Sequence, residues 1–250
     1  MPEMFNIKIT LMYDGSNYSG WQRLGRQDRK PSIQAVLEER ISACLGEEIR
    51  IIGSGRTDAG THALRQVANF HCHIVKPAED MRKEINILLP EDIAILELEE
   101  AEKDFHSRYR VKAKTYEYRI DMGEKQNVFT RKYTCHVPGP LNLGNMERAS
   151  EYFIGSHDFK AFSTDRKDNK STVRTVESIT FTRKENELRI AVTGNGFLYN
   201  MVRIIAGTLI EVGEGIRRPE DMADILAGRD RSKAGPTASS HALFLYDVRY

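Results

Sequence analysis

The chain has 250 residues, with 37 Lys and Arg against 36 Asp and Glu and an apolar content of 40%. This length suits one large domain or two of modest size, and a charged fraction of 29% with 8 Pro and 18 Gly excludes collagen-like, low-complexity and wholly disordered chains. The weakly charged stretch 201–212 contains Arg203 and is too short to span a bilayer. The first residues lack the pattern of a secretory signal, and three cysteines without a C-x-x-C motif indicate a reducing, cytoplasmic compartment.

Hydrophobic periodicity predicts six elements in the first half of the chain. They are a strand at 7–13, a helix from the N-cap Ser32 to Gly46, strands at 48–52 and 66–75, a helix at 78–89 ended by Pro90, and a strand at 93–98. This order is β-α-β-β-α-β, which is typical of ferredoxin-like and RNA-binding sheets.

The second half is predicted to follow a similar order after a seam at 104–110. Its elements are a strand at 112–120, a helix at 143–154, a hairpin of strands 176–183 and 187–193, helices at 197–212 and 219–227, and a final strand at 243–249. The polar stretch 163–171 predicts a mobile surface loop.

Charge is segregated along the chain. Six cations at 103–119 face only Asp104 and Glu117, and seven acids at 91–104 face only Lys103. A second basic cluster, made of Arg23, Arg26, Arg29 and Lys30, meets only Asp28. Two interpretations stay open, namely solvated faces of opposite sign and a nucleic-acid-binding surface.

The segment Gly53-Ser54-Gly55-Arg56-Thr57-Asp58-Ala59-Gly60-Thr61-His62 is predicted to be a long loop between two strands. Its glycines permit a close approach to a ligand, but it lacks the Lys of a P-loop and the third Gly of G-x-G-x-x-G. One interpretation is a glycine-rich turn in which Asp58 caps backbone amides. The other is a ligand-binding loop, in which His62 and Asp58 suggest a catalytic pair without a nominated nucleophile.

Other candidates depend on which face of an element they occupy. Strand alternation separates Cys72 from His71 and His73, so no metal site is predicted. The aromatic residues Tyr13, Tyr18, Trp21, Tyr116 and Tyr118 either stack on bases or pack in the core. Arg203 lies in an apolar helical stretch, where it either has a partner or occupies a solvent-facing stripe.

The sequence GSGRTDAGTHA closely resembles the catalytic-aspartate loop of the bacterial tRNA pseudouridine synthase A family. The blocks LMYDGSNYSGWQR, KAKTYEYRI, GNGFLYNMVRIIAGTLIEVGEG and HALFLYDVRY are similar to blocks of that family in the same order. The resemblance implies an α+β pseudouridine synthase fold with two ferredoxin-like or RNA-recognition-like subdomains, 1–106 and 107–250. These would form a mixed, mainly antiparallel central sheet flanked by helices.

The same resemblance implies a cytoplasmic, homodimeric enzyme without a membrane partner. It would isomerise uridine to pseudouridine in the tRNA anticodon stem-loop, at positions 38, 39 and 40, without a cofactor or metal. Asp58 matches the catalytic aspartate, Arg203 the cation that pairs with it, and Tyr116 the aromatic ring that stacks on uracil. Further residues matched to substrate binding are Arg56, Thr57, His62 and Leu198. The chain departs from the family at Thr61, Arg65 and 239–243, which bears on the choice of uridine.

The implied chemistry fits these residue types. Pseudouridine formation breaks the bond between N1 and C1′ and rejoins the base through C5, with no net redox change. It needs an ionised carboxylate near C1′ and C6, acting as a nucleophile or as a base. The uridine must also leave its stack, which calls for an aromatic platform and a residue that fills the gap, roles that suit Tyr116 and Arg56. A paralogue acting on another RNA site and a non-catalytic RNA-binding protein stay open as alternatives.

Overall fold

Two units of helices and strands make up the structure, a computed structural model that describes residues 3–23, 30–73, 76–164 and 171–250. Unit 1 comprises Met1–Lys112 with Phe244–Tyr250, and unit 2 comprises Ala113–Leu243. The last strand, which the sequence analysis placed in the second half, therefore belongs by its contacts to the first unit. Each unit is described by itself.

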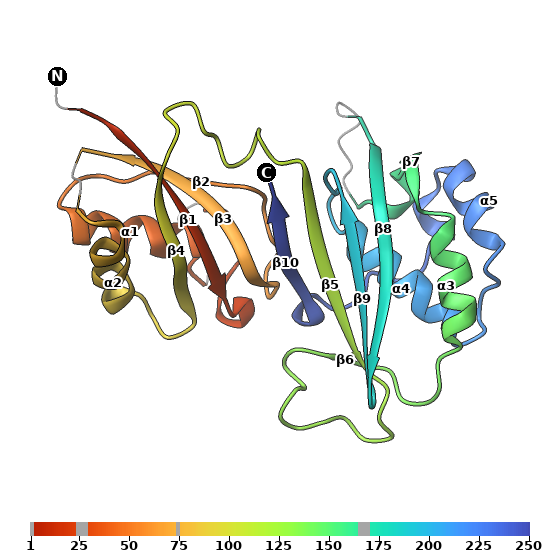
Figure 1. The fold of residues 1–250 in the computed structure, drawn as a ribbon. Coiled ribbons are helices and arrows are strands. Elements are labelled where there is room, and N and C mark those ends of the chain that lie inside the picture. Colours follow the sequence, from red (N-terminus) through yellow and green to blue (C-terminus); the bar gives the residue numbers. More distant parts are fainter. Residues whose placement is uncertain (1–2, 24–29, 74–75, 165–170) are drawn as a thin grey trace. The chain divides into compact units, whose positions relative to one another are not determined.

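Unit 1 has the predicted β-α-β-β-α-β order and adds the last strand of the chain. Its elements are β1 (Phe5–Tyr13), α1 (Ile33–Leu45), β2 (Ile51–Gly53), β3 (His62–Cys72), α2 (Ala78–Leu88), β4 (Ile93–Ala101) and β10 (Leu243–Arg249). β1 pairs antiparallel with β3 and β4, and β2 pairs antiparallel with β3. β10 runs parallel to β3, with Phe244 opposite His62 and Leu245 opposite Ala63. Both helices lie together beside these strands (Figure 1).

Local sequence determines α1 closely. The Ser32 side chain accepts a hydrogen bond from the Ala35 amide, and Gly46 ends the helix with a φ of 70°. Ile33, Leu37, Ile41 and Leu45 recur at helical spacing, and all four are buried. The predicted caps of this helix are confirmed.

Two strands of unit 1 begin at different residues from those predicted. β2 starts at Ile51 instead of 48, because the Ile49 amide bonds to the Ser42 side chain instead of a strand. β3 starts at His62 instead of 66, because pairing with β10 extends the strand toward its N-terminal end. Both differences come from contacts that lie outside the strand's own sequence.

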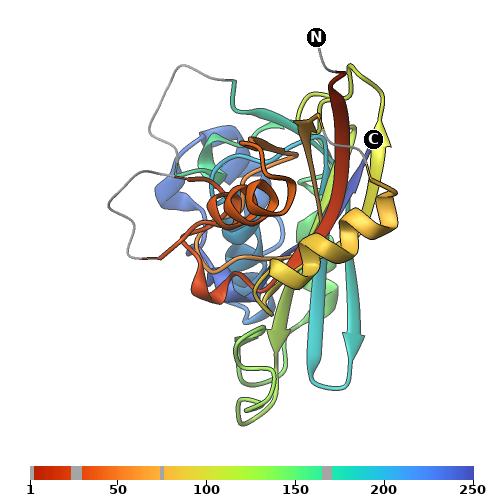
Figure 2. The same cartoon turned by 90° about the vertical axis from the view of Figure 1, so that its left-hand side faces the viewer.

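The strands of unit 2 also pair mainly antiparallel. Its elements are β5 (Ala113–Asp121), β6 (Cys135–His136), α3 (Leu143–Glu151), β7 (Gly155–Asp158), β8 (Val173–Lys184), β9 (Glu187–Gly194), α4 (Met201–Gly213) and α5 (Asp221–Gly228). Within this unit the strands follow the order β5-β9-β8-β7, with β6 parallel to β5. The predicted hairpin is confirmed and turns at Glu185, whose φ is 54°. Figure 2 shows the unit 1 helices α1 and α2 from their own side.

The helix α4 starts four residues later than predicted. Asn200 has a left-handed conformation (φ 62°, ψ 6°), which a right-handed helix cannot include, so the helix begins at Met201. Residues 165–170 of the predicted mobile loop lie outside the described residues. Among the helices in the described ranges, none combines the length and the apolar character needed to cross a membrane.

Candidate active site

The predicted residues Arg56, Thr57 and Asp58 lie on the connection between β2 and β3 of unit 1, and His62 is the first residue of β3. Thr57 anchors this loop. Its side chain is buried, and its hydroxyl shares a hydrogen bond of 2.7 Å with the Tyr13 hydroxyl. Its carbonyl accepts a hydrogen bond of 3.0 Å from the Trp21 amide. The residue before Asp58 is therefore fixed through both its side chain and its backbone.

Gly20 lets the backbone approach the loop closely at this anchor. A Cβ added to Gly20 would lie 2.6 Å from the Thr57 carbonyl oxygen and 3.1 Å from the Asp58 carbonyl carbon. Its φ of 103° is also one that residues with a side chain rarely adopt. Only glycine allows the segment at Gly20 and Trp21 to hold Thr57 in this way.

Asp58 opens a tight turn on the other side of the anchor. Its carbonyl accepts a hydrogen bond of 3.0 Å from the Thr61 amide, and Gly60 has a φ of 76°. A positive φ at the third position is what a type II turn requires. Asp58 is half-buried between the buried residues Thr57 and Thr61, while Arg56 is exposed. The loop therefore presents one partly accessible carboxylate on a fixed turn.

His62 anchors the far end of the loop. Its side chain is 1% exposed, and its ring stacks on Phe244 with centroids 4.7 Å apart. The Gly15 amide donates a hydrogen bond of 3.1 Å to His62 Nδ1, and an Asp14 carboxylate oxygen lies 3.1 Å from the same atom. The imidazole thus ties the start of β3 to the segment that follows β1.

Three of the predicted residues, Tyr116, Leu198 and Arg203, lie in unit 2. Tyr116 is on β5, is 7% exposed and meets Phe197 edge to face, with centroids 5.3 Å apart. Its neighbour Tyr118 is fully buried, and burial raises the pKa of its hydroxyl. Base stacking by Tyr118, which strand alternation suggested, is therefore wrong.

Arg203 is held by acceptors on both sides. In the first turn of α4, its Nε donates to the Ala238 carbonyl at 2.6 Å, and its Nη1 donates to Asn200 Oδ1 at 2.7 Å. Asn200 is itself fixed by a hydrogen bond of 2.7 Å from its Nδ2 to the Thr164 hydroxyl. Arg203 is half-buried and bonded to protein, so it has the partners that a cation in this apolar stretch needs. Leu198 is half-buried just before this helix, and its carbonyl accepts a hydrogen bond from the Met201 amide.

Comparison with known proteins places these loops in a sequence family. A family model described as "tRNA pseudouridine synthase" matches residues 9–110 and 149–250. A "tRNA pseudouridine synthase A" of Thermoanaerobacter sp. (strain X514) is 43% identical over 247 residues, which cover 99% of this chain and 100% of that protein. A "tRNA pseudouridine synthase A 2" of Clostridium tetani (strain Massachusetts / E88) is 44% identical over 245 residues, which cover 98% of each.

The chain belongs to the tRNA pseudouridine synthase family. Members of this family are isomerases, and the α+β pseudouridine synthase fold that the resemblance implied is confirmed. The "Crystal Structure of a Cbf5-Nop10-Gar1 Complex" is similar over 95% of this chain and 57% of that one, at 12% identity and a TM-score of 0.36.

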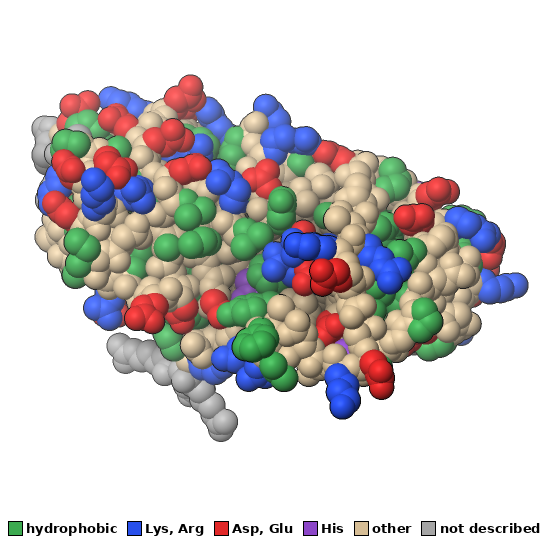
Figure 3. All heavy atoms as spheres, turned by 60° about the horizontal axis from the view of Figure 1, so that its bottom comes forward, with side chains coloured by type: hydrophobic (Ala, Val, Ile, Leu, Met, Phe, Trp, Pro, Cys, Tyr) green, Lys and Arg blue, Asp and Glu red, His purple; other side chains and the backbone are tan. Residues whose placement is uncertain are grey.

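In the folded chain, the positive and negative charges are less segregated than they are along the sequence. Arg110 forms ion pairs with Glu102 (2.7 Å) and Asp104, so the basic run and the acidic run neutralise each other there. The departure at Arg65 is paired with Glu97 at 2.8 Å. Figure 3 shows cationic and acidic side chains intermixed over one face. The described side chains of this face therefore mix both signs of charge.

Sequence reasoning missed two kinds of residue that position the site. Tyr13 and Gly20 fix the loop, but in the sequence Tyr13 was considered only for stacking or core packing. Asn200 orients Arg203, and its only sequence signal was an Asn before an apolar helix, which favours a left-handed residue at that point. These residues act through contacts that periodicity does not reveal.

Proposed function

We propose that the protein converts uridine to pseudouridine in the anticodon stem-loop of tRNA, at positions 38, 39 and 40, with Asp58 as the catalytic carboxylate. The observation that carries this proposal is the clamped turn of Arg56, Thr57 and Asp58. It holds one partly accessible carboxylate in place before substrate arrives, as a reaction that needs close positioning requires. Membership of the family supports the same reaction.

The reaction rearranges bonds within one nucleotide. The bond between N1 and C1′ breaks, the base turns, and C5 bonds to C1′, while N1 gains a proton and C5 loses one. An ionised Asp58 would assist this either by attacking carbon or by removing a proton. No electrons are gained or lost overall, so the reaction needs no redox cofactor.

The remaining predicted residues are proposed to support Asp58. Arg203 would pair with the carboxylate and keep it ionised, and Tyr116 would stack on the uracil. Arg56 would engage the RNA beside the extruded uridine. Thr57 and His62 fix the loop, and Leu198 would contact the substrate. A cytoplasmic homodimer is part of the same proposal and is supported by the resemblance.

Incubation of the purified protein with unmodified tRNA, followed by mapping of pseudouridine, tests the proposal. The wild type is expected to modify positions 38, 39 and 40, and Asp58→Asn to lose at least about 10³-fold in rate with little change in tRNA affinity. Asp224→Asn, which changes an exposed acid on α5, is the matched control and should keep full activity.

Each part of the proposal can fail separately. A wild type that binds tRNA without forming pseudouridine would identify a non-catalytic RNA-binding protein. Modification at another nucleotide would identify a paralogue with a different site. Full turnover by Asp58→Asn would make Asp58 a structural residue of the loop.

A further inference from the structure

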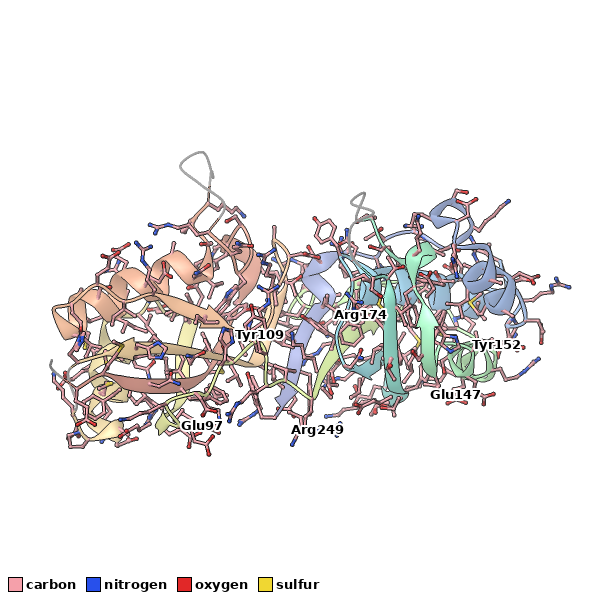
Figure 4. All side chains as sticks on the ribbon, turned by 90° about the horizontal axis from the view of Figure 1, so that it is seen from above. Glu97, Tyr109, Glu147, Tyr152, Arg174 and Arg249 are labelled. Atoms are coloured by element: carbon pink, nitrogen blue, oxygen red, sulfur yellow. The ribbon has the colours of Figure 1, made fainter. Side chains whose placement is uncertain are left out.

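A fully buried amide side chain lies on β3 against the loop of residues 54–61, called here the Asp58 loop. Gln66 is 0% exposed, and the next residues on the same face of the strand, Ala68 and Phe70, are apolar and equally buried. Its neighbour Arg65 occupies the opposite face and pairs with the exposed Glu97 of β4, which Figure 4 labels. Burial of an amide is unfavourable unless its polar atoms are hydrogen-bonded, so the partners of Gln66 explain its presence here.

Gln66 ties the start of the Asp58 loop to β3. The Ser54 hydroxyl donates to Gln66 Oε1 at 2.6 Å, and Gln66 Nε2 donates to the Gly55 carbonyl at 3.1 Å. Because a carbonyl can only accept, the amide nitrogen must face Gly55, and the amide oxygen then faces Ser54. The Ser54 amide also donates to the Val67 carbonyl at 2.8 Å. The residues that follow β2 are thus held on β3 through both backbone and side chain.

The same amide also contacts the anchor of Thr57. The Tyr13 hydroxyl, which shares a hydrogen bond of 2.7 Å with the Thr57 hydroxyl, forms a second hydrogen bond with the Gln66 side chain. Burial raises the pKa of the Tyr13 hydroxyl, so it stays neutral and can both donate and accept. Gln66 therefore acts on the loop at two points, directly at Gly55 and through Tyr13 at Thr57.

A second buried amide on β3 has a different set of partners. Asn69 is also 0% exposed, and an odd number of residues separates it from Gln66, which places it on the opposite face of the strand. Its Nδ2 donates to Asn6 Oδ1 at 2.9 Å, and its Oδ1 accepts a hydrogen bond of 3.0 Å from the Ser107 amide. These partners lie outside the Asp58 loop, so the two amides allow loop contacts to be separated from general stabilisation.

We propose that Gln66 is a positioning residue for the reaction, whose amide fixes the backbone that leads into Asp58. A reacting group has to be held within about 0.5 Å of its productive position by the residues around it. Gln66 meets this need from the interior, since a fully buried side chain does not contact the RNA. The inference rests on the proposed function, because it takes Asp58 as the carboxylate that reacts.

Gln66→Met tests the proposal, because methionine has a similar length and makes neither hydrogen bond. The single-turnover rate at saturating tRNA should fall about tenfold, as expected for a displacement below 1 Å, while tRNA affinity stays within about twofold of wild type. Ser54→Ala removes only the hydroxyl that donates to Gln66 and disturbs the interior less. It should lose rate by about three- to fivefold, and it provides the test if Gln66→Met does not fold.

Asn69→Leu is the matched control. It removes two hydrogen bonds of a buried amide on the same strand and keeps a similar side-chain volume. We expect it to lower the melting temperature about as much as Gln66→Met does, because both leave buried polar groups unpaired. Its single-turnover rate, measured well below the melting temperature, should stay within about twofold of wild type.

Gln66→Glu gives a readout that loss of stability alone would not produce. An ionised carboxylate can accept from Ser54 but cannot donate to the Gly55 carbonyl, whereas a protonated one can do both. Burial raises the pKa of a carboxyl group, so the protonated form persists in weakly acidic solution and is lost as the pH rises. The rate of Gln66→Glu divided by that of wild type should therefore be higher at pH 6 than at pH 8.5.

Amide hydrogen exchange tests the loop without an activity assay. The Thr61 amide, whose hydrogen bond to the Asp58 carbonyl closes the turn, should exchange about tenfold faster in Gln66→Met and at the wild-type rate in Asn69→Leu. The proposal is overturned if folded Gln66→Met or Ser54→Ala keeps the wild-type rate, if Asn69→Leu loses as much rate, if the loss lies in tRNA affinity, or if the Gln66→Glu ratio does not change with pH. A wild type that forms no pseudouridine would refute the proposed function, and unchanged Thr61 exchange in Gln66→Met would refute the role of Gln66.

Discussion

Replacing Gly20 by alanine should strongly lower the rate of the chemical step. It should lower the stability of the fold only moderately. The added methyl group would lie 2.6 Å from the Thr57 carbonyl oxygen, and an ordinary contact begins at 3.4 Å. The loop would therefore have to move by about 0.8 Å at the residue before Asp58, and a displacement near 1 Å can cost about 10²-fold in rate. We expect a single-turnover rate about 30- to 100-fold below wild type, with tRNA affinity retained.

The stability cost follows from the backbone conformation. A φ of 103° at Gly20 is strained for alanine, at a cost of about 1–3 kcal/mol. For a chain of this length each kcal/mol lowers the melting temperature by about 2–4 °C. Thermal melting followed by circular dichroism measures this loss, and rapid-quench assays with saturating tRNA measure the rate.

Gly46→Ala is the control that separates strain from displacement. Gly46 also has a positive φ, of 70°, but nothing lies within 4 Å of an added Cβ. This variant should lose about 1–2 kcal/mol of stability and keep its rate. If folded Gly20→Ala keeps a rate within about threefold of wild type, or if Gly46→Ala loses as much rate, then close packing at Gly20 does not position Asp58 and our reasoning is wrong.

Two further predictions concern the proposed partner of Asp58. Arg203→Met should lose more activity at pH 6 than at pH 8.5, because alkaline solution restores the ionised carboxylate that the cation would otherwise favour; parallel pH–rate profiles would show that Arg203 acts by orientation alone. Asn200→Gly keeps the positive φ and removes the side chain that accepts from Arg203 Nη1, so we expect the single-turnover rate to fall about tenfold with the KM for tRNA retained. A wild-type rate in Asn200→Gly would show that the Ala238 carbonyl suffices to aim the guanidinium.

Elements whose ends depend on neighbouring residues were predictable from the sequence. The caps of α1 at Ser32 and Gly46 use hydrogen bonds between residues at most four positions apart in the sequence. The spacing of Leu37 and Ile41 indicates which face of the helix is buried. The start of β3 was not predictable in this way. It depends on Phe244, which lies far along the chain, and no local pattern contains that information.

The candidate site shows the same division. The motif containing Asp58 identified the loop, and the helical stretch around Arg203 identified a cation that needs partners. The surroundings of these residues come from distant segments, since Tyr13 contacts Thr57 and the Ala238 carbonyl accepts a hydrogen bond from Arg203. Tyr118 illustrates the limit of alternation, which gives the face of a strand but not whether that face is covered.

The place of β10 in unit 1 bears on how the chain folds as it is synthesised. The ring on which His62 stacks is that of Phe244, the Tyr250 hydroxyl donates to the Ser107 carbonyl at 2.6 Å, and Asp247 lies 3.6 Å from Arg65. Domains that are continuous in sequence can fold in turn behind the ribosome. Here the unit that carries the Asp58 loop is begun first and closed last, because all of unit 2 lies between its two parts in the sequence. The residues of unit 2 are made before β10, so the loop reaches its final form only after β10 is translated.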